Sequence, residues 1–200
     1  SGEFKGAYGL TEPNSGSDAL GAKTTATLSS DRKHYILNGQ KCWITNGGFA
    51  DAYTVFAKID GEQFTAFILE RGMEGFTTPT THGKWSLRAS ATGELVFDNV
   101  KIPKENILPN VKGLKGPLGC LSKARYGIAW GTLGAAMDCY DTALRYSKER
   151  VQFGKPIAAF QLQQKKLAEM LTEITKGQLL VWRLGVLMNE GRATPAQISM

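Results

Sequence analysis

Apolar and polar residues follow different periods in the two parts of the chain. Up to about residue 110, short runs rich in β-branched and aromatic side chains are separated by turn-forming residues. Closely spaced short strands of this kind predict an antiparallel β-sandwich or barrel. Beyond a connector at residues 101–115, apolar residues recur every three to four positions, and this spacing predicts helices.

Turn-forming pairs locate the strands of the first part. Asn38-Gly39 and Asp60-Gly61 each stand between two apolar runs, and each pair predicts a hairpin with a tight two-residue turn. The run Gly93–Phe97 is followed by Asp98-Asn99, which predicts a further strand and turn.

The second part predicts two long helices and the start of a third. Pro117 suits the first turn of a helix, which runs to about Glu149 and is broken by Gln152–Pro156. The next helix is expected to stop at Gly191. Thr194-Pro195 then predicts the cap and first residue of a third helix.

The predicted fold class is therefore α+β. An antiparallel β-sandwich or barrel domain occupies residues 1–110, and an incomplete all-α helical bundle occupies residues 111–200. In the first predicted helix, Gly127, Gly131 and Ala135 fall on one face. Small residues on a helix face allow another helix or a ligand to approach closely, and we favour helix packing for most of them.

Composition and charge limit the classes of function. The net charge of +6 favours anionic partners, but the basic residues are scattered, so we expect no nucleic-acid surface. The chain has three cysteines and no C-x-x-C pair, which predicts neither a metal site nor a disulfide framework. No apolar run reaches the roughly 20 residues that a membrane-spanning helix needs, so no membrane-spanning helix is expected.

Three clusters carry candidate chemistry. Residues 8–18 form a strand and loop whose N–H groups and hydroxyls suit a ring with many acceptors or a phosphate; alone, they fit a surface turn equally well. Trp43–Asn46 combines an aromatic wall with a hydroxyl, although Trp commonly serves packing. Arg150–Pro156 places an arginine at a helix break, where it caps the helix or grips a pyrophosphate.

Together these clusters resemble the acyl-CoA dehydrogenase family. Their order and spacing agree with the family over essentially all 200 residues. The motifs that carry the resemblance are Thr11-Glu12-Pro13-x-Ser15-Gly16-Ser17-Asp18, Asn38-Gly39-x-Lys41-x-Trp43-Ile44-Thr45-Asn46 and Arg150-x-Gln152-Phe153-Gly154.

Within the family, the second half is most similar to glutaryl-CoA dehydrogenases. The residues concerned are Trp85–Gly93, Gly119–Leu121, Ala124–Gly131 and Leu167–Thr175. The first 75 residues resemble general long-chain acyl-CoA dehydrogenases at least as well, notably at Ile44–Asp51.

The resemblance implies FAD as cofactor. The backbone around Tyr8 and Leu10 and the Thr11 hydroxyl would bind the pyrimidine end of the flavin, and the Thr45 hydroxyl would approach the flavin atom N5. The full set of implied cofactor-binding residues is Tyr8, Leu10, Thr11, Gly16, Ser17, Trp43, Ile44, Thr45, Arg150, Phe153 and Gln161.

The resemblance also implies α,β-dehydrogenation of an acyl-CoA thioester. Glutaryl-CoA, with oxidative decarboxylation to crotonyl-CoA, is the expected substrate; a straight-chain or long-chain acyl-CoA, an oxygen-using oxidase relative and a non-catalytic flavin- or CoA-binding module are the alternatives. The implied substrate residues are Ser17, Leu118, Gly119, Cys120, Leu121 and Arg125.

A catalytic base is not expected in the chain. A minority of the family place the base immediately before the arginine matching Arg125, and this chain has Ala124 there. The base is therefore expected downstream of Met200, and the isolated chain is expected to be inactive. The family further implies an electron-transferring flavoprotein as partner, a homotetramer, and a cytoplasmic (bacterial) or mitochondrial-matrix (eukaryotic) location.

Overall fold

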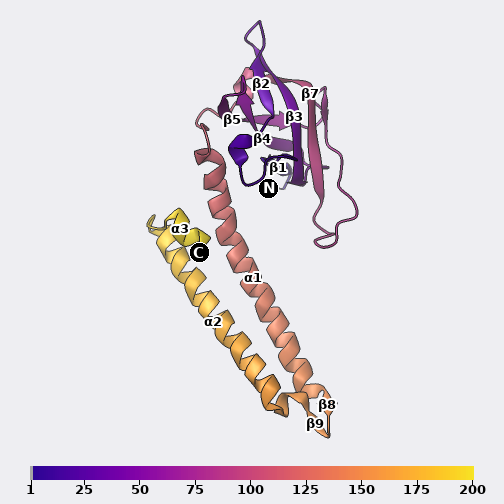
Figure 1. Cartoon of the computed structure of the whole chain (residues 1–200), viewed down its shortest axis with the longest axis vertical. Helices are drawn as coiled ribbons and strands as arrows, with labels where there is room; N and C mark the ends of the chain where they lie inside the picture. The colour runs from indigo at the N-terminus through magenta and orange to yellow at the C-terminus, as the bar shows by residue number, and fades with distance from the viewer. Residues whose placement is uncertain (1) are drawn as a thin grey trace. The chain divides into compact units, whose positions relative to one another are not determined.

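The computed structural model describes residues 2–200 and forms two compact units, one ending at Leu118 and the other spanning Gly119–Met200 (Figure 1). The first unit is a β-domain and the second is helical. The fold class predicted from the sequence is confirmed.

A curled seven-stranded sheet forms the first unit. Its strands are β1 (Gly6–Gly9), β2 (Thr25–Leu28), β3 (His34–Thr45), β4 (Ala52–Ile59), β5 (Gln63–Glu70), β6 (Phe76–Thr77) and β7 (Thr92–Pro103), with 3-10 turns η1 (Ala19–Gly21) and η2 (Lys104–Asn106). The strand order is β1-β4-β2-β3-β7-β6, and β5 pairs with β4. Four pairings are antiparallel as expected, whereas β1–β4 and β2–β4 are parallel.

The two parallel pairings place β1 and β2 on different parts of β4. β1 pairs with Ala52–Val55, and β2 pairs with Lys58 and Ile59. The chain between them, residues 10–24, therefore leaves the sheet after β1 and returns to the same neighbouring strand. That excursion contains the first of the three sequence motifs.

One of the predicted hairpins is confirmed and two turn predictions are wrong. Asp60 and Gly61 have φ of +51° and +80° and connect β4 to β5, as a tight turn requires. By contrast, β3 runs unbroken through Asn38-Gly39, and β7 runs unbroken through Asp98-Asn99.

The two misassigned pairs lie together at one irregularity of the β3–β7 ladder. The register shifts between Leu37 and Gly39. The Asn99 backbone N–H donates to Asn38 Oδ1 at 2.8 Å, and Asn38 Nδ2 donates to Asn99 Oδ1 at 3.2 Å. These side chains supply hydrogen bonds at a β-bulge rather than a turn, because pairing along two twelve-residue strands outweighs the local turn preference.

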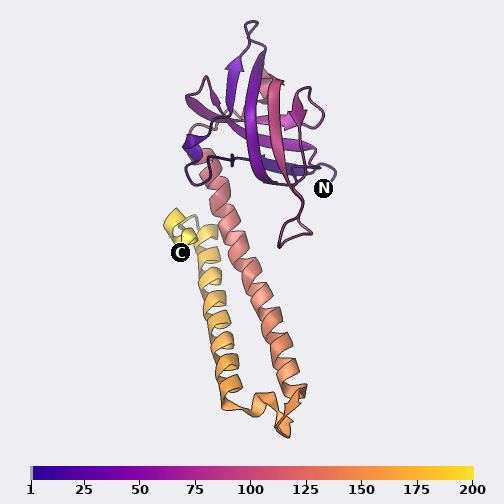
Figure 2. The ribbon, with the colours of Figure 1, turned by 45° about the vertical axis from the view of Figure 1, so that its right-hand side comes forward.

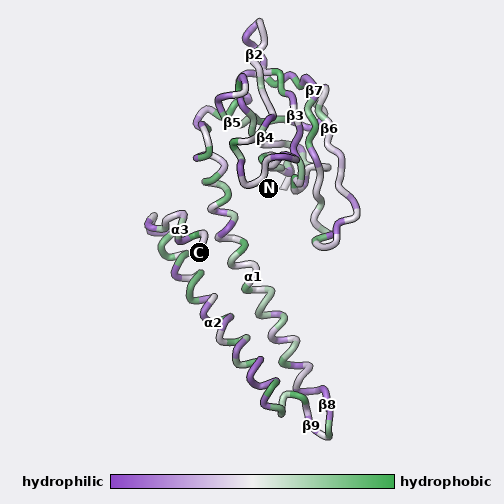
Figure 3. The backbone as a smooth tube through the Cα atoms, in the orientation of Figure 1, coloured by the Kyte–Doolittle hydropathy of each residue, from purple (hydrophilic) through white to green (hydrophobic). Residues whose placement is uncertain are grey.

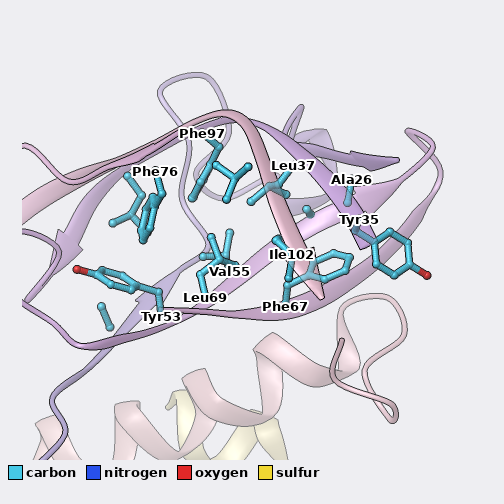
Figure 4. Close-up of a cluster of buried hydrophobic side chains, with 14 of the residues drawn as sticks. Ala26, Tyr35, Leu37, Tyr53, Val55, Phe67, Leu69, Phe76, Phe97 and Ile102 are labelled. Carbon is cyan, nitrogen blue, oxygen red and sulfur yellow. The ribbon is translucent and has the colours of Figure 1, made fainter. Parts of the chain in front are cut away.

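The core of the sheet is built from alternating apolar residues of β3, β4, β5 and β7 (Figure 4). Aromatic rings connect the strands: Tyr53 meets Phe76 edge-on at 4.9 Å, and Tyr35 meets Phe67 at 5.1 Å between ring centroids. Each fully buried large side chain contributes roughly 1.5–3 kcal/mol. The β-domain therefore has a substantial core of its own.

Helices form the second unit, apart from one two-stranded hairpin. Its elements are α1 (Lys115–Glu149, whose first turn belongs to the β-domain unit), β8 (Val151–Gln152), β9 (Lys155–Pro156), η3 (Ile157–Ala159), α2 (Gln161–Asn189) and α3 (Pro195–Ser199). α1 and α2 lie side by side in both Figure 1 and Figure 2. Thr194 and Gln197 form a capping box on α3, so the expected third helix is confirmed. None of the helices within residues 2–200 combines the length and apolarity that crossing a bilayer requires.

Glycines of α2, rather than those of α1, allow the two long helices to pack. A Cβ at Gly177 would meet Leu133 Cδ2 at 2.6 Å, and one at Gly185 would collide with the Tyr126 hydroxyl. Among the described residues nothing lies within 4 Å of a Cβ built at Gly127 or Gly131. The expectation that the α1 glycines serve helix packing is therefore wrong for the packing within this chain.

Much of the helical unit remains exposed. Figure 3 shows apolar and polar residues interleaved along α1 and α2. Ile174 and Val181 are the buried apolar side chains of this unit among the described residues. The helical hairpin therefore has little core compared with the β-domain.

Candidate functional site

Residues 10–24 form a loop that hydrogen bonds hold in place beside the sheet. Glu12 and Ser15 exchange two backbone hydrogen bonds of 3.0 and 3.1 Å. The Ser15 hydroxyl donates to the Asp18 carbonyl at 2.6 Å, and the Lys58 N–H on β4 donates to the Thr24 carbonyl at 2.9 Å. The first motif is thus an ordered loop and not a loose surface turn.

A buried ion pair lies inside this loop. Lys41 Nζ on β3 contacts Glu12 Oε1 at 2.7 Å, and the Lys41 side chain is fully buried. The other donors to the Glu12 carboxylate are the backbone N–H groups of Lys23 at 2.6 Å and Thr24 at 3.0 Å. Lys41 Nζ also donates to the Leu10 carbonyl at 3.1 Å. The pair therefore joins both ends of the loop to β3.

The two charges respond differently to burial. Burial acts to raise the pKa of Glu12, but hydrogen bonds from Lys41, Thr24 and Lys23 together lower it. Burial lowers the pKa of Lys41 from its ordinary value, and the partnership with Glu12 opposes that change. Glu12 is consequently an ionised anchor for three donors.

A second bulge in β3 turns Trp43 outwards. Lys41 pairs with Leu95 and Ile44 pairs with Gly93, so β3 has one extra residue there. Trp43 has φ of +60°, and its side chain is 67% exposed although it sits in the middle of the sheet motif. The bulge therefore presents a large aromatic ring on an open surface.

Thr45 faces the same side of β3 as Trp43. Ile44, between them, is buried in the core, and alternate residues of a strand share a face. Both Trp43 and Thr45 are exposed. The Cys42 N–H donates to the Thr11 carbonyl at 2.9 Å, which places the first motif directly beside the second.

Hydrogen bonds from Tyr53 and Arg71 hold the turn that follows Thr45. The Tyr53 hydroxyl donates to the Gly47 carbonyl at 3.0 Å and the Ala50 carbonyl at 2.8 Å. Arg71 Nη2 donates to the Tyr53 oxygen, and Arg71 Nε donates to the Ala50 carbonyl, both at 2.8 Å. Burial raises the pKa of Tyr53, so its hydroxyl remains a donor. The end of β3 that carries Thr45 is therefore rigid.

The other sequence-predicted residues of the β-domain differ in how they are placed. Tyr8 and Leu10 are half-buried and pack against the small apolar cluster of Phe56 and Phe64. Because the Ile44 side chain is in the core, only its backbone is available to a ligand. Gly16 and Ser17 lie exposed on the loop, where a Cβ at Gly16 would meet open space.

The remaining predicted cofactor residues lie on the helical unit. Arg150 follows α1 and is exposed. Phe153 and Gly154, with φ of +52° and +73°, form the tight turn of the β8–β9 hairpin, a hairpin that the sequence reading missed. The Phe153 ring is 85% exposed, and Gln161 begins α2. The predicted cofactor set is thus divided between the two units.

Five of the six predicted substrate residues, all except Ser17, lie along the first turns of α1. Leu121, Ala124 and Arg125 line one shallow concavity of about 430 Å³ together with Ile128 and Met200. Leu118, Gly119 and Cys120 are exposed. Ala124 offers no titratable group, so the concavity has no carboxylate at that position.

Two concavities of the β-domain lie away from Trp43 and Thr45. One of about 530 Å³ is lined by Met73, Gly75, Asp98 and Lys101 among others, and one of about 180 Å³ is lined by residues 12–15, Thr24 and Gln40 among others. No group of three or more metal-ligating side chains occurs within residues 2–200. The candidate site is therefore an open surface, and its chemistry rests on the ring, hydroxyl and peptide groups that it presents.

Lys41 belongs to the second motif but is not among the site residues predicted from the sequence. Lysines are rarely fully buried unless paired, and nothing local in the sequence pairs Lys41 with Glu12, which lies 29 positions away.

Comparisons with known proteins find a matching family model for each of the two units. Residues 7–100 match the acyl-CoA dehydrogenase middle domain, and residues 112–200 match the acyl-CoA dehydrogenase C-terminal domain. The chain is 46% identical over 192 residues to the short-chain specific acyl-CoA dehydrogenase of Megasphaera elsdenii, which covers 94% of this chain and 50% of the relative.

Solved structures extend the same similarity. A glutaryl-CoA dehydrogenase from Mycobacterium smegmatis in complex with FADH2 is 45% identical, with a TM-score of 0.95 over 99% of this chain and 50% of that one. A chain in a structure described as the electron transferring flavoprotein of Acidaminococcus fermentans is 42% identical, with a TM-score of 0.91, over 100% of this chain and 53% of that chain. The chain spans about half the length of these relatives.

Proposed function

The chain belongs to the acyl-CoA dehydrogenase family, and on that premise we propose that it forms the flavin-binding and part of the acyl-CoA-binding region of an FAD-dependent acyl-CoA dehydrogenase. One observation supports this above the others. The Trp43 ring is held outwards by a β-bulge, with Thr45 on the same side and the Leu10–Glu12 loop hydrogen-bonded beside it.

The residues present suit a flavin. An exposed, rigidly mounted indole offers a planar wall for an isoalloxazine ring, and the Thr45 hydroxyl offers a donor on the same side. Positive φ at a tryptophan costs about 1–2 kcal/mol, and the local packing does not use the ring. When bound, FAD supplies the hydride acceptor for the β-hydrogen of the thioester.

The residues of the chain have separable tasks in this proposal. Trp43 and the Leu10–Thr11 peptide orient the flavin ring, and Thr45 donates a hydrogen bond towards the ring position that receives charge. Arg150, Phe153 and Gln161 hold the adenine diphosphate part of an FAD that is shared with a neighbouring subunit. Leu121 and Arg125 line the acyl-CoA channel.

We further propose glutaryl-CoA as the substrate. The segments Trp85–Gly93, Gly119–Leu121 and Ala124–Gly131 carry the similarity to glutaryl-CoA dehydrogenases. The short-chain relative is 46% identical and the glutaryl-CoA relative 45% identical, so overall identity does not separate the two substrates. An electron-transferring flavoprotein as acceptor and a tetrameric assembly complete the proposal.

A direct test uses a chimera with a relative. Residues 1–200 replace the corresponding half of the Mycobacterium smegmatis glutaryl-CoA dehydrogenase, and the purified chimera is assayed for bound FAD. Glutaryl-CoA and butyryl-CoA are then compared as substrates with an artificial electron acceptor. We expect retained FAD and a higher kcat/KM for glutaryl-CoA. A chimera that folds without flavin would contradict the cofactor proposal, and preference for butyryl-CoA would contradict the substrate.

The chain alone provides the complementary result. Because position 124 is alanine and the adenine end of the FAD is shared with a neighbouring subunit in this proposal, we expect the isolated chain to bind FAD weakly or not at all. We also expect any bound FAD to stay unreduced by glutaryl-CoA. Flavin bleaching at 450 nm at enzyme-like rates would show that another group of the chain acts as the base.

A further inference from the structure

We propose that Lys41, held by Glu12, is a positioning residue of the flavin site: its ammonium group orients and polarises the Leu10–Thr11 peptide, so that the Thr11 N–H faces outwards as a strengthened donor to the flavin ring. The inference deepens the proposed function and rests on it. Lys41 itself touches no cofactor, since its side chain is fully buried.

Two hydrogen bonds fix the orientation of the loop backbone. The Leu10 carbonyl accepts from Lys41 Nζ at 3.1 Å, and the Thr11 carbonyl accepts from the Cys42 N–H at 2.9 Å. Both carbonyls are therefore held from the β3 side. In a trans peptide the N–H points opposite to the carbonyl, so the Thr11 N–H points away from Lys41.

Close packing restricts the conformation of the Lys41 side chain. A Cβ at Gly9 would meet Leu95 Cδ1 at 2.9 Å and Lys41 Cγ at 3.5 Å. The clash would be with Leu95, while the distance to Lys41 is that of an ordinary van der Waals contact. The lysine stem therefore packs directly beside the backbone of Gly9 on its way to Leu10.

The charge of Lys41 acts through the peptide. A cation on a carbonyl oxygen draws electron density from the amide and makes its N–H a better donor, as in other cooperative hydrogen-bond chains of low dielectric. The carboxylate of Glu12 accepts a second hydrogen bond from the same ammonium group at 2.7 Å and keeps it charged and oriented. A donor of this kind stabilises the reduced flavin, which carries more negative charge, more than the oxidised flavin.

Stability alone is a weak reason for this pair. A buried ion pair is often no better than apolar residues of similar volume. Glu12 is also satisfied by the N–H groups of Lys23 and Thr24 without Lys41. The contact that the lysine alone provides is the one to Leu10.

The test separates positioning from folding by removing the whole charge pair. In the chimera with the Mycobacterium smegmatis dehydrogenase, Lys41→Met is compared with the double variant Lys41→Met/Glu12→Gln, which keeps the shape and has no buried charge. Lys101→Met is the matched control, because Lys101 is exposed on the neighbouring strand β7. The readouts in the chimera are the thermal midpoint, the Kd for FAD and the two-electron potential of the flavin at saturating protein. The amide ¹⁵N shift of Thr11 is measured in the 200-residue chain without FAD.

We expect the double variant to unfold within a few degrees of the wild type but to bind FAD about tenfold more weakly. Reduced flavin should lose roughly a further tenfold, which corresponds to a potential about 30 mV more negative for a two-electron couple. The Thr11 amide shift should move, and Lys101→Met should change none of these values.

Each outcome decides the inference. A double variant with the wild-type Kd and potential overturns the role of Lys41 and leaves the proposed function intact. The role is also overturned if the double variant regains both the thermal midpoint and the FAD affinity that Lys41→Met loses, because the single variant would then act through stability. If the chimera that carries the wild-type half folds without binding FAD, both proposals fail together. Should Lys41→Met alone not fold, the double variant gives the same comparison.

Discussion

Trp43 combines three properties that an ordinary strand residue lacks: positive φ, a large ring and high exposure. The left-handed conformation is unfavourable for any side chain but glycine. Replacing Trp43 with glycine should therefore remove that cost while deleting little buried surface. We expect Trp43→Gly to leave the thermal midpoint within about 2 °C of the wild type and to weaken FAD binding at least tenfold, measured by flavin fluorescence.

The matched control for Trp43 is Trp85, which is fully exposed in the same unit. Trp85→Ala should retain both the thermal midpoint and the FAD affinity. Equal loss of flavin binding in the two variants would mean that Trp43 acts only as one exposed aromatic among others. A large drop in stability for Trp43→Gly would place the ring in the folding core instead.

Glu12 gives the sheet unit a specific dependence on acid. Its pKa is lowered in the folded state, so its contribution to stability is complete above the unfolded glutamate pKa of about 4.3. That contribution is lost as the pH falls through the lower folded pKa. We expect the urea-derived free energy of unfolding to fall across this acidic range, and Glu12→Gln to remove this component.

The control for the acid effect is an exposed carboxylate on the same unit. Glu62→Gln, in the β4–β5 turn, should leave the slope of stability against pH unchanged. Parallel curves for the wild type and Glu12→Gln between pH 5 and pH 3 would show that the Glu12 carboxylate is protonated without penalty.

The residue scale also sets the limit of what the sequence reveals about the site. The motifs identify Thr11, Trp43 and Thr45 because each has a residue type that fits a flavin. They do not reveal that Lys41 is buried against Glu12, since this contact depends on β3 passing beneath the loop. A buried charge pair between distant positions requires the tertiary fold.

At the scale of elements, local signals worked where few long-range contacts compete. The helices, the α3 cap and the Asp60-Gly61 hairpin follow from nearby residues. Asn38-Gly39 and Asp98-Asn99 also consist of turn-forming residues, yet both lie within long strands that pair with each other. Their side chains hydrogen-bond across the bulge. Residue types that favour a turn therefore stabilise a β-bulge here instead.

Glycines of the two long helices give an element-scale prediction. Gly131 of α1 has open space where a Cβ would be, whereas a Cβ at Gly185 of α2 would collide with Tyr126. Gly131→Ala should gain up to about 1 kcal/mol of helix propensity. We expect the helical transition, followed by circular dichroism at 222 nm, to rise by a few degrees for Gly131→Ala and by less for Gly185→Ala.

A reversed order of these two variants would be informative. If Gly131→Ala lowered the transition and Gly185→Ala raised it, the face of α1 that carries Gly131 would be packed in solution. Gly134→Ala, on the same helix and equally open, serves as the second measurement and should behave like Gly131→Ala.

On the scale of the whole molecule, the two units differ sharply in their cores. Nearly all buried apolar side chains belong to the β-domain, while Ile174 and Val181 are those of the helical unit among the described residues. Burial of apolar surface is the main source of stability. We therefore expect unfolding in two steps, with α1 and α2 exchanging amide hydrogens at lower urea concentrations than β3, β4 and β7.

Hydrogen exchange read by mass spectrometry assigns each step to a unit, and one variant per unit checks the assignment. Leu37→Ala deletes a fully buried side chain of the sheet core and should lower only the later transition, by about 2–5 kcal/mol. Val181→Ala should lower only the earlier one, and by less, because its surroundings are partly exposed. Coincident transitions that shift together in both variants would mean that the helical hairpin gains its stability from the β-domain. In that case the two units that carry the predicted cofactor residues would unfold as a single cooperative structure.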